Sequence, residues 1–162
     1  GETADARNSF IRYLQTFPEG AFSLNANYYI GLIDYNQQNY ASAAPYLNKV
    51  LEYPNNKYSE EAMMMSAEIA YIAKDYAQSL EWYKLLKDRA STPERRQIAA
   101  TGMLRSAAMS GNGEETILAA TAVLADAKVA PELESEARHY RSKALVEANQ
   151  LTHAVAAAPL MQ

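Results

Sequence analysis

Cysteine is absent from the 162-residue sequence. Its absence excludes disulfide bonds, thiolate nucleophiles and cysteine metal sites, so the fold must rest on packing alone. The chain also lacks any apolar run that approaches the roughly 20 residues of a membrane-spanning helix. We therefore expect no direct insertion of this chain into a membrane.

The excess of acidic over basic residues is also small, because the formal net charge is only -4. Nucleic-acid binding depends on clustered Lys and Arg. The most basic stretch runs from Lys84 to Arg105, and Asp88 and Glu94 dilute it. It is interpreted as a solvated helix surface, and no nucleic-acid partner is expected.

Catalytic motifs are missing too. His139 and His153 are not spaced as in the HExxH zinc motif. The adjacent carboxylates Glu60–Glu61 and Glu114–Glu115 cannot share a substrate, since consecutive helical residues point in different directions. The six glycines form no phosphate-binding loop. The sequence predicts no enzyme, no bound metal and no cofactor.

A repeat of about 37 residues is present. The stretch Tyr35 to Leu47 is echoed by Tyr71 to Tyr83, with polar, small and aromatic positions in the same order. Periods between 20 and 50 residues are typical of repeat folds. A small residue with a larger or apolar partner four positions later recurs five times, at spacings of 37, 36, 37 and 38: Ala6/Phe10, Ala43/Leu47, Ser79/Tyr83, Thr116/Ala120 and Ala154/Ala158.

Each period is interpreted as two helices, because apolar residues recur at helical spacing in both halves. Asn39, Asp75 and Asn112 precede the second helices, where their side chains can cap a backbone N–H. Gln78 and Glu115 complete capping boxes. No segment alternates as a strand would, so the predicted fold class is all-α.

The first helices have start signals of their own. Ser59 precedes two glutamates, and Thr92–Glu94 and Pro131–Glu132 place proline at the first helical position. Pro45 is expected in the first turn after the Asn39 cap, where its missing N–H would have had no helical partner.

These positions resemble the tetratricopeptide repeat family. Its pattern places a small residue midway along the first helix, an aromatic at the start of the second, then a small and a large apolar residue. The matching residues are Gly31, Tyr40, Ala43 and Leu47, then Ala67, Tyr76, Ser79 and Tyr83, and more weakly Ser142, Leu151 and Ala154. In the third unit Gly113 replaces the aromatic, and Leu104 replaces the small residue.

The resemblance implies an α-solenoid of antiparallel helix pairs, with about eight helices in a right-handed superhelix. The whole chain, 1–162, would form a single array. Its parts would be the second helix of a truncated repeat (3–16), three repeats (21–54, 58–90 and the degenerate 92–128) and a last repeat (131–160) that is incomplete at its end.

A narrower resemblance concerns the stretch Phe10 to Gly31. Its helix ends at a proline, and the repeat spacing is near 37 residues. In both respects it is similar to the repeats of bacterial envelope proteins of the TolA-binding (Tol-Pal) and outer-membrane assembly lipoprotein type. This resemblance implies a periplasmic or envelope-associated protein. Gly1 is interpreted as a residue added for expression, with the native start elsewhere.

The resemblance also implies a non-enzymatic module that holds a peptide or protein partner on a concave groove lined by the first helices. Taking Gly31, Ala67, Leu104 and Ser142 as equivalent predicts the groove residues by their offsets. They are Tyr28, Leu32, Tyr35, Met64, Glu68, Tyr71, Thr101, Arg105, Ala108, His139, Lys143 and Val146.

Alternatives stay open at this point. Tyr28, Tyr35 and Tyr71 are equally well explained as core residues, and His139 as an incidental surface residue. The array could instead be a spacer or could self-associate through its ends, a hypothesis favoured by the apolar stretch Ala154 to Gln162. A small-ligand site would require a deep polar pocket that the sequence does not indicate.

Overall fold

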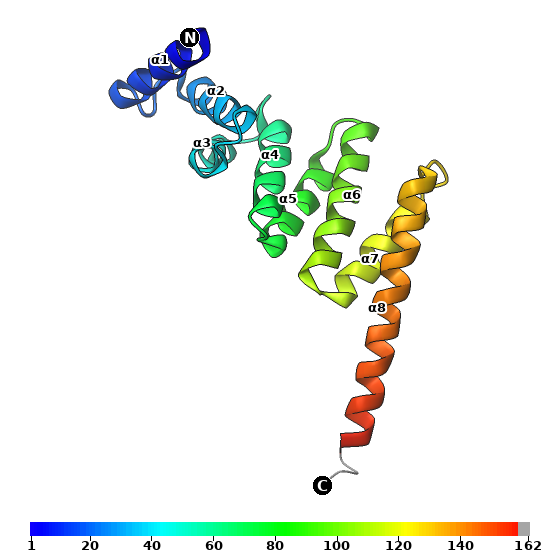
Figure 1. The fold of residues 1–162 in the computed structure, drawn as a ribbon. Coiled ribbons are helices and arrows are strands. Elements are labelled where there is room, and N and C mark those ends of the chain that lie inside the picture. Colours follow the sequence, from blue (N-terminus) through cyan, green and yellow to red (C-terminus); the bar gives the residue numbers. More distant parts are fainter. Residues whose placement is uncertain (159–162) are drawn as a thin grey trace. The chain divides into compact units, whose positions relative to one another are not determined.

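The computed structural model describes residues 1–158 of the chain. Within them no strand occurs, which confirms the all-α prediction of about eight helices. The helices (Figure 1) are α1 (Glu2–Thr16), α2 (Ser23–Asn36), α3 (Tyr40–Glu52), α4 (Ser59–Ile72), α5 (Tyr76–Arg89), α6 (Pro93–Ser110), α7 (Gly113–Leu124) and α8 (Pro131–Ala157).

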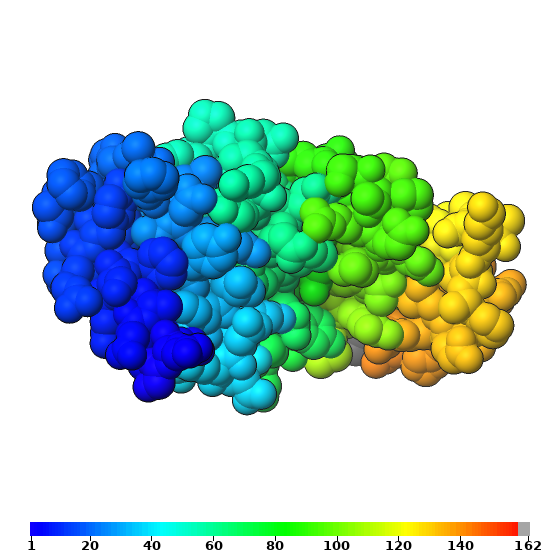
Figure 2. All heavy atoms as spheres, turned by 90° about the horizontal axis from the view of Figure 1, so that it is seen from above, coloured from blue at the N-terminus to red at the C-terminus, as the bar shows by residue number. Residues whose placement is uncertain are grey.

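The helices belong to two compact units, here called unit 1 (Gly1–Lys74, α1 to α4) and unit 2 (from Asp75, α5 to α8). In each unit every helix packs on the next one along the chain, and in unit 2 α6 also touches α8. Figure 2 shows the blue atoms of α1 against the paler blue atoms of α2. This consecutive packing agrees with the predicted solenoid of helix pairs.

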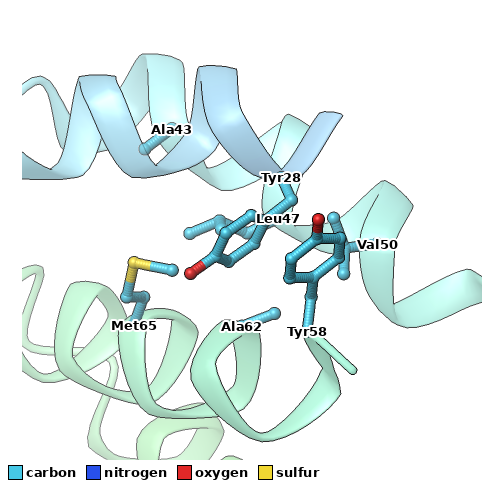
Figure 3. Close-up of a cluster of buried hydrophobic side chains, with 7 residues drawn as sticks. All are labelled: Tyr28, Ala43, Leu47, Val50, Tyr58, Ala62 and Met65. Carbon is cyan, nitrogen blue, oxygen red and sulfur yellow. The ribbon is translucent and has the colours of Figure 1, made fainter. Parts of the chain in front are cut away.

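Each unit has its own apolar cluster. In unit 1, α2, α3 and α4 contribute (Figure 3) Tyr28, Ala43, Leu47, Val50, Tyr58, Ala62 and Met65. In unit 2, α6, α7 and α8 contribute Leu104, Ala119, Ala120, Val123 and Ala137. The cluster of unit 1 contains aromatic, leucine and methionine side chains, whereas alanines dominate the cluster of unit 2.

One turn geometry recurs before three second helices. A residue with a left-handed φ of 61°, 63° or 74° precedes the N-cap in Gln38–Asn39, Lys74–Asp75 and Gly111–Asn112. The predicted side-chain caps form at Asp75 and Asn112, which accept the backbone N–H of Gln78 (3.2 Å) and Glu115 (3.1 Å). The prediction is wrong for Asn39, whose side chain makes no such bond and instead donates to Gln37 (3.5 Å).

Pro45 does not lie in the first turn, so that prediction is wrong. It lies inside α3, which begins at Tyr40. The missing N–H therefore leaves the carbonyl of Ala41 without its usual helical partner. Both Ala41 and Pro45 are exposed, so water can reach this carbonyl and the helix continues.

The last period does not divide into two helices within the described residues, which corrects the expectation for that unit. Ser142, Leu151 and Ala154 all lie in the single helix α8, which Figure 1 shows continuing well beyond α7. Lys143 to Val155 contains no Gly, no Pro and no left-handed residue, so nothing in the sequence ends the helix there. Residues 159–162 of the apolar stretch lie outside the described residues.

A buried ion pair fastens α1 to the rest of unit 1. Asp34 of α2 is 1% exposed, and its carboxylate accepts two hydrogen bonds from Arg7 of α1, at 2.6 and 2.9 Å. Ser42 of α3 donates a third hydrogen bond of 2.6 Å to the same carboxylate. Three helices thus meet at one charge, which would be costly to bury without these partners.

Gly31 allows α2 and α3 to approach closely. A Cβ atom at this position would lie 2.7 Å from Cδ2 and 2.9 Å from Cγ of Leu47, closer than two carbon atoms pack. Leu47 is fully buried and cannot move aside without disturbing the core. The small residue that the repeat pattern requires therefore has a steric reason here.

We predict that Gly31→Ala lowers the free energy of unfolding. Overpacking costs about 1–3 kcal/mol, and the better helix propensity of alanine returns up to about 1 kcal/mol, for a net loss of about 1–2 kcal/mol. Urea unfolding followed by circular dichroism measures it. Gly113→Ala is the matched control, because nothing lies within 4 Å of a Cβ there. An equal effect at both glycines would contradict the steric explanation.

A second prediction concerns the ion pair. Asp34→Ala should lower the free energy of unfolding by about 3 kcal/mol, since it leaves a partly buried guanidinium unpaired. The double variant with Arg7→Ala should lose clearly less than the sum of the two single variants. Asp5→Ala on exposed α1 surface is the control and should change stability by less than about 0.5 kcal/mol. Additive single effects would show that the pair is not coupled.

The same carboxylate predicts a pH dependence. Burial alone would raise the pKa of Asp34, but the hydrogen bonds from Arg7 and Ser42 and the charge of Arg7 lower it below its ordinary value. The unfolded chain therefore binds this proton at a higher pH than the folded chain does. The stability from Asp34 is complete above its ordinary pKa of about 3.9 and is lost as the pH falls through the lower, folded-state pKa. Melting temperatures measured in this range should fall more steeply for the parent than for Asp34→Asn; parallel curves would refute this.

Candidate protein-binding surfaces

The predicted groove residues of unit 1 lie on α2 and α4. Some of them are buried in the core and others are accessible at the surface. Tyr28 is only 9% exposed and belongs to the core cluster. Its ring stacks on that of Tyr58, with centroids 4.0 Å apart and planes 10° apart (Figure 3). Tyr58 is held in turn by Asn25, whose amide donates to its hydroxyl (2.8 Å). Core packing therefore accounts for Tyr28.

Tyr35 and Glu68 connect the two first helices of unit 1. The Tyr35 hydroxyl donates a hydrogen bond to the exposed carboxylate of Glu68. The Tyr35 ring is partly buried against the core and lies edge-on to Tyr40, with centroids 5.7 Å apart. These two predicted residues, 33 positions apart in the chain, thus share one surface.

Leu32, Met64 and Tyr71 are partly buried. Leu32 packs against the core cluster from α2, while Met64 and Tyr71 lie on α4. Of the three consecutive methionines, Met63 and Met65 are buried, so Met64 is the one that keeps more exposure. Unit 1 thus offers aliphatic, thioether, phenol and carboxylate groups on its first helices.

In unit 2 the predicted residues lie on α6 and α8. Exposed Arg105 of α6 forms a two-point ion pair with Glu136 of α8, at 2.8 and 3.0 Å. The hydrogen bonds from Arg105 lower the pKa of Glu136 and outweigh the opposing effect of its burial. Thr101 donates to the backbone carbonyl of Gln97 (2.9 Å), and Ala108 is partly buried. This pair joins two first helices, as Tyr35 and Glu68 do in unit 1.

His139, Lys143 and Val146 lie together on one face of α8. All three are exposed, and they border an open hollow of about 410 Å³ with Ser142, Glu147 and Gln150. The His139 ring lies 5.6 Å from that of Tyr140. The surface is more polar than that of unit 1, with Val146 as its apolar residue.

The described residues give no sign of a metal centre or a membrane span. No group of three or more His, Cys, Asp or Glu side chains in residues 1–158 could hold a metal ion. Among the same residues no helix is long and apolar enough to cross a bilayer.

Sequence reasoning missed several residues that fix these surfaces. Asp34, Asn25 and Glu136 were not singled out, yet each anchors a helix contact. Asp34 could have been found, because it is an acid three and four positions after buried Gly31 and Ile30, and so on the same face of α2. Nothing in the sequence indicates its partner Arg7, 27 positions upstream.

Comparison with known families decides the classification. A family model of the tetratricopeptide repeat matches residues 1–57 and again residues 28–93. Together the matches span 1–93, more than half of the 162-residue chain. The chain belongs to the tetratricopeptide repeat family. Repeats of this family generally mediate protein–protein interactions and are typically non-enzymatic.

The family match ends within the first turn of α6. Beyond it lie the unit in which Gly113 replaces the aromatic and the undivided helix α8, so the match and the sequence pattern weaken at the same place. No curated protein matches the chain. The more specific resemblance to envelope proteins therefore has no support from relatives.

The division of the tyrosines yields a prediction. Tyr28→Ala should lower the free energy of unfolding by about 3–4 kcal/mol, because it removes a buried stacked ring. Tyr35→Phe should lower it by about 1 kcal/mol or less, since it removes one hydrogen bond at the surface. Chemical denaturation of both variants measures the contrast. Similar losses would mean that Tyr35 is structural too.

Proposed function

We propose that the chain binds a peptide or protein partner along the exposed sides of its first helices and catalyses no reaction. The observation that carries the proposal is the Tyr35–Glu68 hydrogen bond, because it joins side chains of two first helices into one accessible patch. Family membership supports a protein partner. The patch includes Leu32 and Met64, which suit an apolar side chain of that partner.

The chemistry of the patch defines the partner further. Glu68 is exposed and can accept a hydrogen bond or pair with a cation, while aromatic and methionine side chains provide apolar contact. In unit 2, His139 and Lys143 offer polar and cationic contacts beside Val146. Each unit would therefore offer its own kind of contact to a partner.

The test uses peptides selected from a displayed random library against the parent protein. Tyr35→Ala combined with Tyr71→Ala should weaken the selected peptides at least about tenfold, because an aromatic contact contributes of order 1 kcal/mol or more. Calorimetry or fluorescence anisotropy measures the affinity. Circular dichroism must show that the variant is folded.

Glu68→Lys tests the charge of the same patch. The matched control is Glu52→Lys on the second helix α3, which makes the same charge change away from the first helices. If both charge variants and the tyrosine double variant bind the peptides as the parent does, the first-helix surface is not the binding site.

A spacer or self-association role is the second candidate. It is favoured by the exposed apolar side chains of α8, since Leu151 and Val155 are 66% and 64% exposed. Sedimentation of the parent and of Leu151→Glu across a wide concentration range decides it. Identical monomers in both cases would contradict self-association.

The periplasmic or envelope location is a further hypothesis, based on the resemblance of the Phe10 to Gly31 stretch to the repeats of bacterial envelope proteins. Fractionation of cells that express the native gene would test it. A protein found only in the cytoplasmic fraction would refute it.

A further inference from the structure

A cavity of about 580 Å³ lies in unit 2, away from every residue of the predicted groove. Its walls are formed by the end of α5, the first turns of α6, the end of α7 with the loop that follows it, and the start of α8. Its volume lies within the range of ordinary ligand sites. Its apolar lining is Pro93, Ala100, Ala122, Val123, Val129 and Leu133.

Four of these apolar residues belong to the core of unit 2. Val123 is a buried member of the core cluster, and Ala100, Val129 and Leu133 pack against that cluster. The cavity floor is therefore held by the packing of α6, α7 and α8. An apolar side chain placed there would extend the core rather than rest on a mobile loop tip.

Charged residues also line the cavity, and the two acids already have local stabilisation. Asp126 accepts the backbone N–H of Lys128 (2.9 Å). Glu94 lies in the first turn of α6, where the helix dipole favours a negative charge. Each carboxylate thus already has one favourable interaction within the protein.

The three basic side chains that line the cavity have few hydrogen-bond partners within the protein. Arg96 donates one of its five N–H groups to the carbonyl of Ala90 (3.0 Å). The ammonium groups of Lys87 and Lys128 have no hydrogen bond or ion pair with any of residues 1–158. With three bases against two stabilised acids, a carboxylate entering the cavity meets a favourable field.

We propose that this cavity is a second binding site, which takes an apolar side chain of a protein partner with an acidic residue beside it in the partner's sequence. The apolar side chain fills the floor at Val123, Val129 and Leu133. The neighbouring carboxylate pairs with Lys87 or Lys128 at the mouth. This site is independent of the first-helix surface proposed above.

The experiment is a titration of the isotope-labelled 162-residue protein with short synthetic peptides, followed by nuclear magnetic resonance. The probe is acetyl-Gly-Glu-Leu-Glu-Gly-amide. It should shift the signals of Ala100, Val123, Val129 and Leu133, at peptide concentrations up to about 5 mM, as expected for one anchor residue. The peptides with Lys-Leu-Lys or Glu-Ala-Glu centres should bind at least about fivefold more weakly.

Variants locate the site. Lys128→Glu should weaken the probe about tenfold, because it turns an attractive charge into a repulsive one near the protein surface. Ala122→Phe should also weaken it, since Ala122 is exposed and a larger ring there covers the mouth. Lys74→Glu, at an exposed position of unit 1 outside both proposed surfaces, makes the same charge change as the matched control and should leave affinity unchanged. Circular dichroism confirms that each variant is folded.

Three results would overturn the proposal. They are no signal change at the highest concentration, equal binding of the acidic and basic peptides, and shifts confined to His139, Lys143 and Val146. The last result would assign the probe to the first-helix surface and so support that surface while removing this site.

Discussion

Close packing of consecutive helices is the constraint on which each unit depends. Within residues 1–158 a helix in either unit packs mainly on its chain neighbours, so a poor contact between two neighbours is compensated by few others. Small residues therefore occupy the closest approaches: Gly31 faces Leu47, and a Cβ on Gly102 would lie 2.5 Å from the Tyr83 ring. Fully buried Ser79 and Ser106 share a 2.9 Å hydrogen bond in the same α5–α6 contact.

Polar contacts determine how the packed helices are aligned with one another. Apolar ridges can slide with little change in buried area, whereas the Asp34 carboxylate is satisfied in one arrangement of α1, α2 and α3. On the surface, Arg105–Glu136 fixes α6 against α8 in the same manner, at a smaller energy because Arg105 is half exposed. These polar contacts therefore oppose a change of register between the helices that carry the proposed binding residues.

Local patterns were predictable from the sequence, and contacts between distant residues were not. Period, helix number, and the caps at Asp75 and Asn112 follow from nearest-neighbour chemistry, which the sequence displays directly. The failures at Pro45 and α8 are also local, since a solvent-facing carbonyl tolerates proline and no residue after Lys143 stops the helix. The partner of Asp34 and the stacking of Tyr28 on Tyr58 depend on three-dimensional proximity, which no spacing rule supplies.

The fate of the tyrosines shows why helix offsets alone cannot assign a binding surface. Tyr28 and Tyr35 are seven residues apart on α2 and thus lie on nearly the same face. Yet Tyr28 lies under the ring of Tyr58, which α4 contributes at its N-terminal cap, whereas Tyr35 reaches the exposed Glu68 nearer the middle of α4. What covers a residue depends on which part of the neighbouring helix lies opposite, so accessibility changes along one face. A partner that follows this face would meet apolar packing first and a polar patch two turns later.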